Sequence, residues 1–302
     1  MRFHLVDFAN FYTENMTPKI LVTGATGTIG TYVLRQLQEK GADFRALVRT
    51  SGKAKTLNDK GISTAIGDFD DLTSLHAAME GVDKVFLLSV TSPEIPRLQS
   101  HVTDVAARHG IRHIVKISAR GANIDSDVGI HRFHAQAEGY IRESGIPFTF
   151  LQPEAFMQNL FFDRETIRDR GELFSQAGDG KVPMIDARDI AAVAVAALLN
   201  EGHEGKTYVL TGPEAISYHD IAAALTEALG KKVKYIPVTS VQSRSSMQEA
   251  GMPSWLVEDL VAVGKQHASG SVSDVSPDLN KVLGRQGITI GEFIRDYIEV
   301  FR

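Results

Sequence analysis

Three evenly spaced glycines, Gly24, Gly27 and Gly30, are the feature that most constrains the fold of this chain. They lie between an apolar run at 19–23 and an amphipathic segment at 28–40, which is the strand–loop–helix context of a phosphate-binding turn. In such a turn the first glycine permits a sharp exit from the strand, the second lets the backbone approach a pyrophosphate, and the third lets the helix pack closely. Free N–H groups at the helix start attract phosphate. The loop therefore predicts a dinucleotide site.

Short apolar runs alternate with helical patterns through the first half of the chain. Continuous runs of Val, Ile and Leu are typical of parallel strands that are buried on both faces. The expected strands are 19–23, 44–48, 63–66, 84–88, 113–117 and 148–152, and the expected helices are 28–40, 71–79, 95–109 and 130–144. The repeated strand–helix order predicts an α/β fold with a doubly wound parallel sheet of the Rossmann type.

The pattern changes after Pro153. We expect residues 17–153 to form the dinucleotide-binding Rossmann core and residues 154–302 to form a smaller, mostly helical C-terminal substrate lobe, with segments near 181–213 returning to the core. The expected elements of this half are helices at 187–199 and 217–229, strands at 207–210 and from Val233, a Gly-rich loop at 171–184, and further helices through 240–302. Ser217 and Asp220 form an acidic variant of the capping box.

Residues 1–16 stand apart from this pattern as an N-terminal extension. They contain Asp7 and Glu14 and lack the apolar stretch of a signal peptide. Met16 directly precedes the expected domain, so we expect the extension to be either non-native or loosely docked. The alternative is an N-terminal strand through Phe3, Leu5 and Val6.

Composition excludes several classes of function. The 302 residues contain no cysteine, which excludes disulfides, thiolate metal sites and cysteine nucleophiles and suits a cytoplasmic protein. A net charge of -5 gives no basic face for nucleic acid. No apolar run is long enough to cross a membrane. The expected partner is a small molecule, and the protein is expected to be a monomer or a homodimer.

Longer motifs place the chain in a family. The stretches ALVRTSGKA (46–54), GDFDD (67–71), GVDKVFLLS (81–89), GIRHIVKIS (110–118) and ESGIPFTFLQPEAFMQN (143–159) follow the glycine loop in order. Together they resemble the NmrA-like branch of the atypical short-chain dehydrogenases, with the closest likeness to its triphenylmethane and quinone reductases. The resemblance covers nearly everything from Lys19 onward. It implies a Rossmann fold and NADP-dependent oxidoreductase activity.

The end of the second expected strand bears on the choice of cofactor. An NAD-preferring site places an acid there for the ribose 2′-hydroxyl, whereas this chain has Arg49, with Lys53 close behind. A planar guanidinium suits a 2′-phosphate, so the sequence favours NADPH over NADH. The alternative is that both are ordinary solvated cations. The expected cofactor-binding residues are Gly24, Thr26, Gly27, Thr28, Ile29, Gly30, Arg49, Lys53, Asp68, Phe69, Leu88, Ser89, Val90, His134, Pro153 and Phe156, of which the family resemblance implies Asp68 and Phe69.

The acid of ordinary short-chain dehydrogenases is missing. Those enzymes use a serine with a Tyr-x-x-x-Lys pair, in which the tyrosine protonates a carbonyl oxygen as hydride arrives. Ser118 occupies the serine position, but Ile130 and His134 occupy those of the tyrosine and the lysine. Either the protein performs no chemistry, or its acceptors need no strong acid at the hydride step, as with quinones, cationic dyes and conjugated imines.

Two residues are the expected catalytic groups, His134 and Ser118. The resemblance to the reductases implies that His134 contacts the nicotinamide or relays a proton, whereas the alternative is a histidine packed on a core edge. His131 and His134 could form a metal pair, but no acidic third ligand lies nearby in sequence, and no metal is expected. Asp186 and Asp189 are expected to cap a helix.

Residues after the sixth expected strand should line the acceptor cleft, because ligands in doubly wound sheets lie beyond the carboxyl ends of the strands. The expected substrate-contacting residues are Glu154, Met157, Asn159 and Trp255, the last on a flap that starts near Met252. Such an apolar lining suits a flat aromatic or conjugated acceptor. The alternative is that these side chains form the core of the smaller lobe.

These observations favour an NADPH-dependent reductase that passes hydride directly to a quinone-, dye- or imine-like acceptor. The alternative is a redox sensor of the NmrA type that binds NADP without turnover. A third hypothesis, a sugar-nucleotide epimerase or dehydratase, shares the fold but needs the tyrosine that Ile130 replaces.

Overall fold

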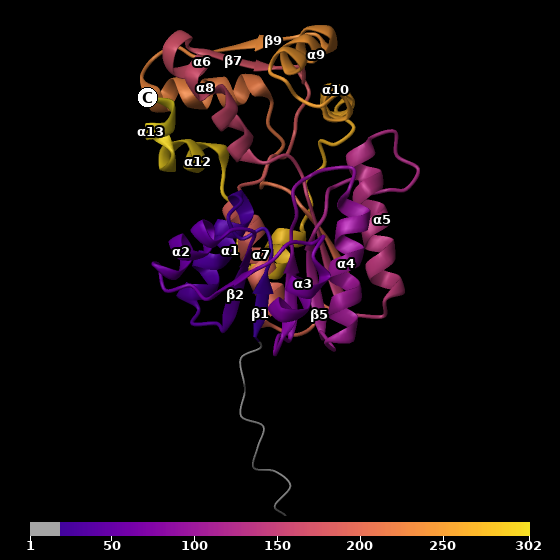
Figure 1. Cartoon of the computed structure of the whole chain (residues 1–302). Coiled ribbons are helices and arrows are strands. Elements are labelled where there is room, and N and C mark those ends of the chain that lie inside the picture. The colour runs from indigo at the N-terminus through magenta and orange to yellow at the C-terminus, as the bar shows by residue number, and fades with distance from the viewer. Residues whose placement is uncertain (1–18) are drawn as a thin grey trace, which may run out of the picture.

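A computed structural model describes residues 19–302 of the chain, arranged as a sheet-centred core with a smaller lobe above it (Figure 1). The expected N-terminal extension at 1–16, including Phe3, Leu5 and Met16, lies outside the described residues. No helix between residues 19 and 302 is both long and apolar enough to cross a membrane.

Seven parallel strands form the core sheet in the order β3-β2-β1-β4-β5-β6-β8. The strands are β1 (Ile20–Val22), β2 (Phe44–Val48), β3 (Thr64–Ile66), β4 (Lys84–Leu87), β5 (His113–Ile117), β6 (Phe148–Pro153) and β8 (Lys206–Leu210). The chain runs outward from β1 to β3 and then returns to add β4 on the other side of β1. This reversal is the topological switch point at which such sheets bind nucleotides.

Helices cover both faces of the core sheet. Helices α1 (Thr28–Glu39), α2 (Ser51–Asn58), α7 (Ala187–Leu199) and α11 (Asp278–Leu283) pack on one face. Helices α3 (Leu72–Met79), α4 (Ile95–Arg108) and α5 (Gly129–Glu143) pack on the other. Helix α7 and strand β8 come from the second half of the chain, and α11 joins them against the same face.

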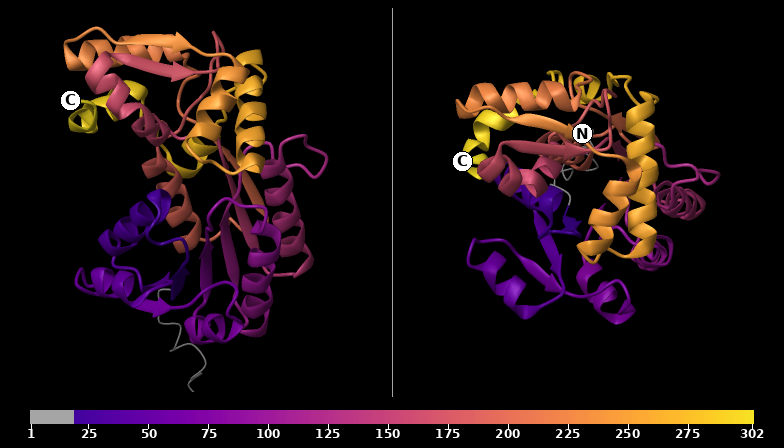
Figure 2. Two further views of the ribbon diagram at one scale, coloured as in Figure 1. Left: turned by 45° about the horizontal axis from the view of Figure 1, so that its top comes forward. Right: turned by 90° about the horizontal axis from the view of Figure 1, so that it is seen from above.

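The smaller lobe has its own hydrophobic core around a two-stranded parallel sheet, β7 (Glu172–Ser175) and β9 (Lys234–Pro237). Its other elements are the 3-10 helix η2 (Met157–Asp163), α6 (Arg164–Arg170), α8 (Tyr218–Leu229), α12 (Ile290–Asp296) and α13 (Ile298–Phe301). Contacts among the rings of Phe161, Phe293 and Tyr297, of which Phe161 and Phe293 are stacked, join η2 to the segment around α12. Helices α9 (Ser240–Glu249) and α10 (Ser254–Ser269) stand apart above α5, on the opposite side from α12 and α13 (Figure 2).

The structure confirms the expected fold class and corrects some local predictions. Every expected strand and helix of the first half is present, with no end shifted by more than one residue. The segment at 171–184 is not all loop, because β7 occupies part of it: four residues between Gly171 and Gly178 are too few to show an alternating pattern. The short helices α2 and α6 were also not anticipated. The capping box of Ser217 and Asp220 is confirmed.

Of the two acids predicted to cap the helix at 187–199, Asp186 caps α7, whereas Asp189 lies in its first turn and binds the C-terminal segment instead. Asp186 is fully buried, and its carboxylate accepts from the backbone N–H of Arg188 at 2.8 Å. Asp189 accepts from the backbone of Ile288 at 2.7 Å and from the Arg285 guanidinium at 2.7 Å. Asp186 thus caps the helix and Asp189 joins it to the C-terminal segment, so both carboxylates are structural.

Candidate nucleotide and acceptor site

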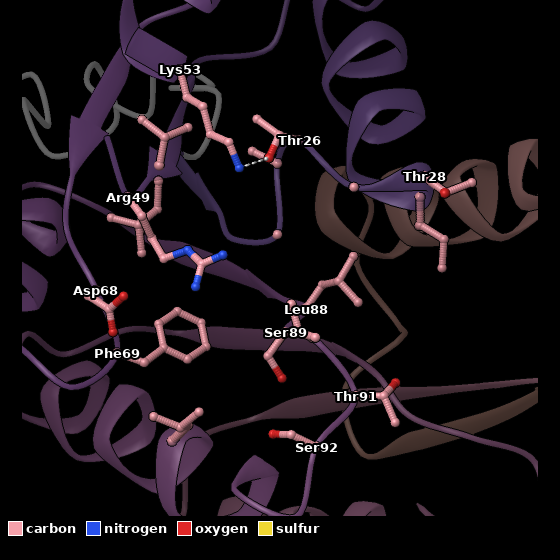
Figure 3. Close-up of a pocket in the computed structure, with 18 of the residues that line it drawn as sticks. Thr26, Thr28, Arg49, Lys53, Asp68, Phe69, Leu88, Ser89, Thr91 and Ser92 are labelled. Atoms are coloured by element: carbon pink, nitrogen blue, oxygen red, sulfur yellow. Dashed lines mark hydrogen bonds between the residues drawn. The ribbon is translucent and has the colours of Figure 1, made fainter. Parts of the chain in front are cut away.

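A cavity of about 690 Å³ lies at the carboxyl ends of β1 to β4, at the switch point of the sheet (Figure 3). Most of the expected cofactor-binding residues line it: Gly24, Thr26, Gly27, Thr28, Ile29, Arg49, Lys53, Asp68, Phe69, Leu88, Ser89, Val90 and Phe156. The residues not anticipated are Ala25, Leu47, Val48, Gly67, Thr91, Ser92 and Leu98. Three of the expected cofactor-binding residues do not line this cavity: Gly30, Pro153 and His134.

The glycine loop has the geometry that a bound pyrophosphate needs. Gly24 has φ +61°, which favours glycine, and a Cβ there would lie 2.8 Å from the Leu88 carbonyl oxygen. A Cβ on Gly30 would lie 2.1 Å from the Gly24 carbonyl oxygen, so the third glycine lets the helix close on the loop itself. A Cβ on Gly27 would have only the Gly24 carbonyl oxygen within 4 Å, at 3.3 Å, and is otherwise free.

The start of α1 is a ready anion site. Its N-cap residue is Gly27, which has no side chain to cap the helix, and the first turn contains no acid. The first N–H groups of a helix lack intrahelical partners, and with the helix dipole they favour a negative charge. Thr26 and Thr28 flank these groups on the cavity wall.

Two cations face the same cavity. The Lys53 ammonium lies 3.4 Å from the Thr26 hydroxyl, and Arg49 extends toward the ring of Phe69 (Figure 3). Within residues 19–302, neither Arg49 nor Lys53 forms an ion pair with a carboxylate. Thr50, between them, caps α2 by accepting from the backbone N–H of Lys53 at 3.3 Å, which positions the lysine. The glycine turn, the start of α1 and the two cations together fit a dinucleotide that carries a 2′-phosphate.

His134 lies in a buried polar group on α5, outside the lining of the cavity. It is 8% exposed on the second turn of α5, and its Nδ1 is 2.9 Å from the Nζ of Lys116, which is fully buried on β5. Burial, together with the neighbouring Lys116, lowers the pKa of His134 well below its ordinary value. The imidazole is therefore neutral, a state in which one ring nitrogen donates and the other accepts.

Ser118 is placed differently from a serine that faces substrate. It is 4% exposed, and its hydroxyl donates to Glu138 Oε1 at 2.5 Å. The Glu138 carboxylate also accepts from Gln152 at 2.9 Å and from Arg142 at 2.9 Å. The structure thus gives Ser118 a role in joining β5 to α5 rather than a place in the cavity, because its side chain turns toward the helix packed on that face of the sheet.

The expected acceptor residues separate into three environments. Met157 is 1% exposed and packs in the core of the smaller lobe, so it offers no surface to a ligand. Glu154 is buried between Arg120, at 3.3 Å, and His267, at 3.4 Å, and is committed to these ion pairs. Asn159 is exposed, and Trp255 lies edge-on to Phe133 at 6.2 Å between ring centroids. Of the residues after β6, Phe156 alone lines the cavity.

His131 and His134 do not share a metal site. The Nδ1 of His131 is 3.2 Å from the Ser126 hydroxyl and its ring packs on Gly121, whereas His134 turns toward Lys116. No group of three or more metal-type side chains is present among residues 19–302.

A family profile described as the NmrA-like family matches residues 16–286. The chain belongs to the NmrA-like family. NAD(P)H azoreductase of Xenophilus azovorans is 42% identical over 285 residues, covering 93% of this chain and 99% of that relative. NADPH-dependent quinone oxidoreductase of Escherichia coli, solved with NADPH, has a TM-score of 0.84 at 29% identity and covers 92% and 99% of the two chains. Triphenylmethane reductase of Citrobacter sp., solved with NADP(H), has a TM-score of 0.82 at 30% identity with the same coverage.

These relatives confirm the predicted membership of the NmrA-like family and the predicted enzyme class, an oxidoreductase. They share the fold over nearly their whole length, including the region of the cavity. The predicted cofactor, NADPH, agrees with the nucleotides in the two solved structures.

Proposed function

We propose that this protein is an NADPH-dependent reductase of conjugated aromatic acceptors, such as quinones, cationic dyes and azo compounds. The observation that carries the proposal is the cavity at the switch point, in which a glycine-rich turn lies together with two cations that have no carboxylate partner among residues 19–302. Relatives named for azo, quinone and triphenylmethane reduction support the choice of acceptor class.

The residues of the chain have distinct tasks in this proposal. Arg49 and Lys53 bind the 2′-phosphate, while Gly27 and the N–H groups at the start of α1 bind the pyrophosphate. When bound, NADPH supplies a hydride to the acceptor. Phe156, at the end of the cavity nearest β6, supplies an apolar surface on which a flat acceptor can pack.

The absence of a tyrosine acid restricts the acceptors. Ile130 and His134 stand on the first turns of α5, where ordinary short-chain dehydrogenases carry Tyr-x-x-x-Lys. A ketone needs its oxygen protonated as hydride arrives, whereas a quinone delocalises the added charge and a cationic dye is neutralised by it. The site therefore favours quinones and cationic dyes over ketones.

The experiment measures NADPH consumption by the purified protein with a quinone, a cationic triphenylmethane dye and an azo dye, each against a protein-free control. Gly27→Val is the blocking variant, because Gly27 lines the cavity with φ -84° and its new Cβ, 3.3 Å from the Gly24 carbonyl oxygen, would crowd the turn where the pyrophosphate is expected. Gly139→Ala, on α5 with no atom within 4 Å of the new Cβ, is the matched control.

Saturable turnover that Gly27→Val abolishes and Gly139→Ala retains would support the proposal. Tight NADPH binding without turnover of any acceptor would contradict it and favour a redox sensor that binds the nucleotide without using it.

A further inference from the structure

Lys116, on the core sheet, is a buried lysine without a carboxylate partner in the described range. Lys116 is fully buried on β5, in the register position between Leu87 of β4 and Phe150 of β6. Its Nζ contacts the Ile117 carbonyl oxygen at 3.1 Å and His134 Nδ1 at 2.9 Å, and it forms no ion pair with any residue in the described range. A buried ammonium without a carboxylate is costly, so a protein that keeps one is expected to use it.

The carboxylate that could neutralise Lys116 is engaged elsewhere. Glu138 lies one turn along α5 from His134, but its oxygens accept from Ser118, Gln152 and Arg142. Burial lowers the pKa of Lys116 to about 7, and the charge of Glu138 only partly opposes this effect. The side chain can thus gain and lose a proton near neutral pH.

The contact with Lys116 determines how the imidazole of His134 is oriented. While Lys116 is protonated its ammonium has donors and no acceptor, so His134 Nδ1 accepts from it and the ring proton lies on Nε2. Nε2 makes no hydrogen bond to any residue in 19–302, and it is absent from the fully enclosed side-chain atoms that lack a partner. Nε2 therefore keeps accessible surface and a proton to donate.

Lys116 and His134 lie at the carboxyl edge of the sheet, the edge that also holds the nucleotide cavity. Lys116 is the penultimate residue of β5, whose carboxyl end lies between those of β4 and β6. The loop after β4 and Phe156 after β6 both line the nucleotide cavity. His134 stands on α5 directly against this edge of the sheet.

We propose that Lys116 is the positioning residue for His134: it fixes the Nε2–H tautomer and replaces the proton that His134 gives to a reduced acceptor. This inference rests on the proposed reductase function. After a quinone has received a hydride, its oxygen carries a negative charge and takes the proton from His134 Nε2. Nδ1 then takes a proton from the Lys116 ammonium, which leaves a neutral amine and a neutral imidazole. Water returns a proton to Nε2 as the Nδ1 proton passes back to Lys116.

The test compares two acceptors that differ in their need for a proton. A quinone needs one after the hydride, whereas a cationic triphenylmethane dye is neutralised by the hydride and needs none. Lys116→Met should lower quinone turnover about tenfold or more, less than the roughly 10²–10⁴-fold that a general acid itself contributes, because His134 remains, and should leave dye turnover unchanged. Lys84→Met is the matched control, because Lys84 is a part-buried lysine of the same sheet that instead contacts the Leu198 carbonyl at the amino end of β4.

Equal losses with both acceptors, or no loss with either, would overturn the inference. The His134→Gln variant should show the same selective loss, and the double variant should lose no more than either single variant. Additive losses would also contradict a shared proton path.

A second readout does not depend on turnover. Imidazole ¹⁵N NMR of the wild-type protein without acceptor should show His134 as the Nε2–H tautomer. Lys116→Met should change this tautomer. It should also raise the pKa of His134, because a neighbouring positive charge is removed. Glu138 and His131 are the other titratable groups near the pair, and both remain in the variant. An unchanged imidazole spectrum would refute the positioning role. Failure of the wild type to reduce any acceptor would instead refute the proposed function.

Discussion

We propose that two cationic side chains give the cavity a preference for a nucleotide with a 2′-phosphate. Arg49 and Lys53 approach it from the end of β2 and the start of α2, and no carboxylate in residues 19–302 neutralises them. Hydrogen bonds between charged groups contribute about 1.5–3 kcal/mol each. The choice between NADPH and NADH is therefore expected to depend mainly on these two residues.

Replacing Arg49 tests this assignment. Arg49→Ala should weaken NADPH binding by about tenfold, because one charge-assisted hydrogen bond to the 2′-phosphate is lost, and should leave NADH binding unchanged. The measurement is a fluorescence or calorimetric titration with each nucleotide. Arg45→Ala is the control, since Arg45 donates to the carbonyls of Ala78 and Glu80 instead. Equal weakening for both nucleotides would refute the role of Arg49.

The residues of the cavity could be predicted where they follow strands. The parallel order brings the ends of β1, β2, β3 and β4 to one edge, so Gly24, Arg49, Asp68 and Leu88 were accessible from the sequence. The sequence does not show toward which face of the sheet a side chain turns at the end of a strand. For this reason Ser118 was expected at the catalytic site, whereas its hydroxyl turns toward Glu138 of α5. Lys116 was overlooked although it carried a signal: a cation inside an apolar strand that is expected to be buried on both faces.

At the scale of the elements, two contacts connect the C-terminal half of the chain to helices of the core. On one side the hydroxyl groups of Tyr32 on α1 and Tyr297 next to α12 are 2.5 Å apart. On the other side Asp259 of α10 is 8% exposed and accepts from the backbone N–H of Gly129 at 2.7 Å and of Ile130 at 2.8 Å. Helix α5 has no capping side chain of its own, so a distant element caps the helix that carries His134. Sequence patterns could not reveal this, because Asp259 is 130 residues from Gly129.

Removing this cap should loosen the contact between α10 and α5. Asp259→Ala should lower the free energy of unfolding by about 2 kcal/mol, because two buried N–H groups lose their acceptor. Asp259→Asn retains one acceptor oxygen and should lose less. Chemical denaturation of both variants measures the effect, and hydrogen exchange at Gly129 and Ile130 locates it. A loss below about 0.5 kcal/mol in the alanine variant, the range of ordinary surface changes, would contradict the capping role.

At the scale of the whole molecule, the two edges of the sheet have different roles. The carboxyl edge holds the cavity and the Lys116–His134 pair, whereas the amino edge of β5 and β6 holds a buried histidine, His113. Its Nε2 is 2.9 Å from the Thr149 hydroxyl, and its Nδ1 has no hydrogen-bond partner among residues 19–302. Burial lowers the pKa of His113 to about 4, with Lys84 adding to the shift and Glu204 opposing it.

This histidine makes the folded state sensitive to acid. Between pH 6.5 and 4 the unfolded chain protonates His113 and the folded chain does not, so the free energy of unfolding falls as the pH drops through this range. A shift of this size corresponds to about 3 kcal/mol. His113→Gln should flatten the dependence, as measured by denaturant unfolding at several pH values between 7 and 4. An identical slope in wild type and variant would refute this assignment.

The central claim is direct hydride transfer to a conjugated acceptor in a site without a tyrosine acid, and isotope transfer tests it most directly. The protein would be given NADPH deuterated at C4, on each face of the nicotinamide in turn, with a cationic triphenylmethane dye in ordinary water. We predict that, with one face only, the central carbon of the reduced dye carries deuterium. Reduced dye that carries only protium with both nucleotides, or no reduced dye beyond the protein-free control, would contradict the account.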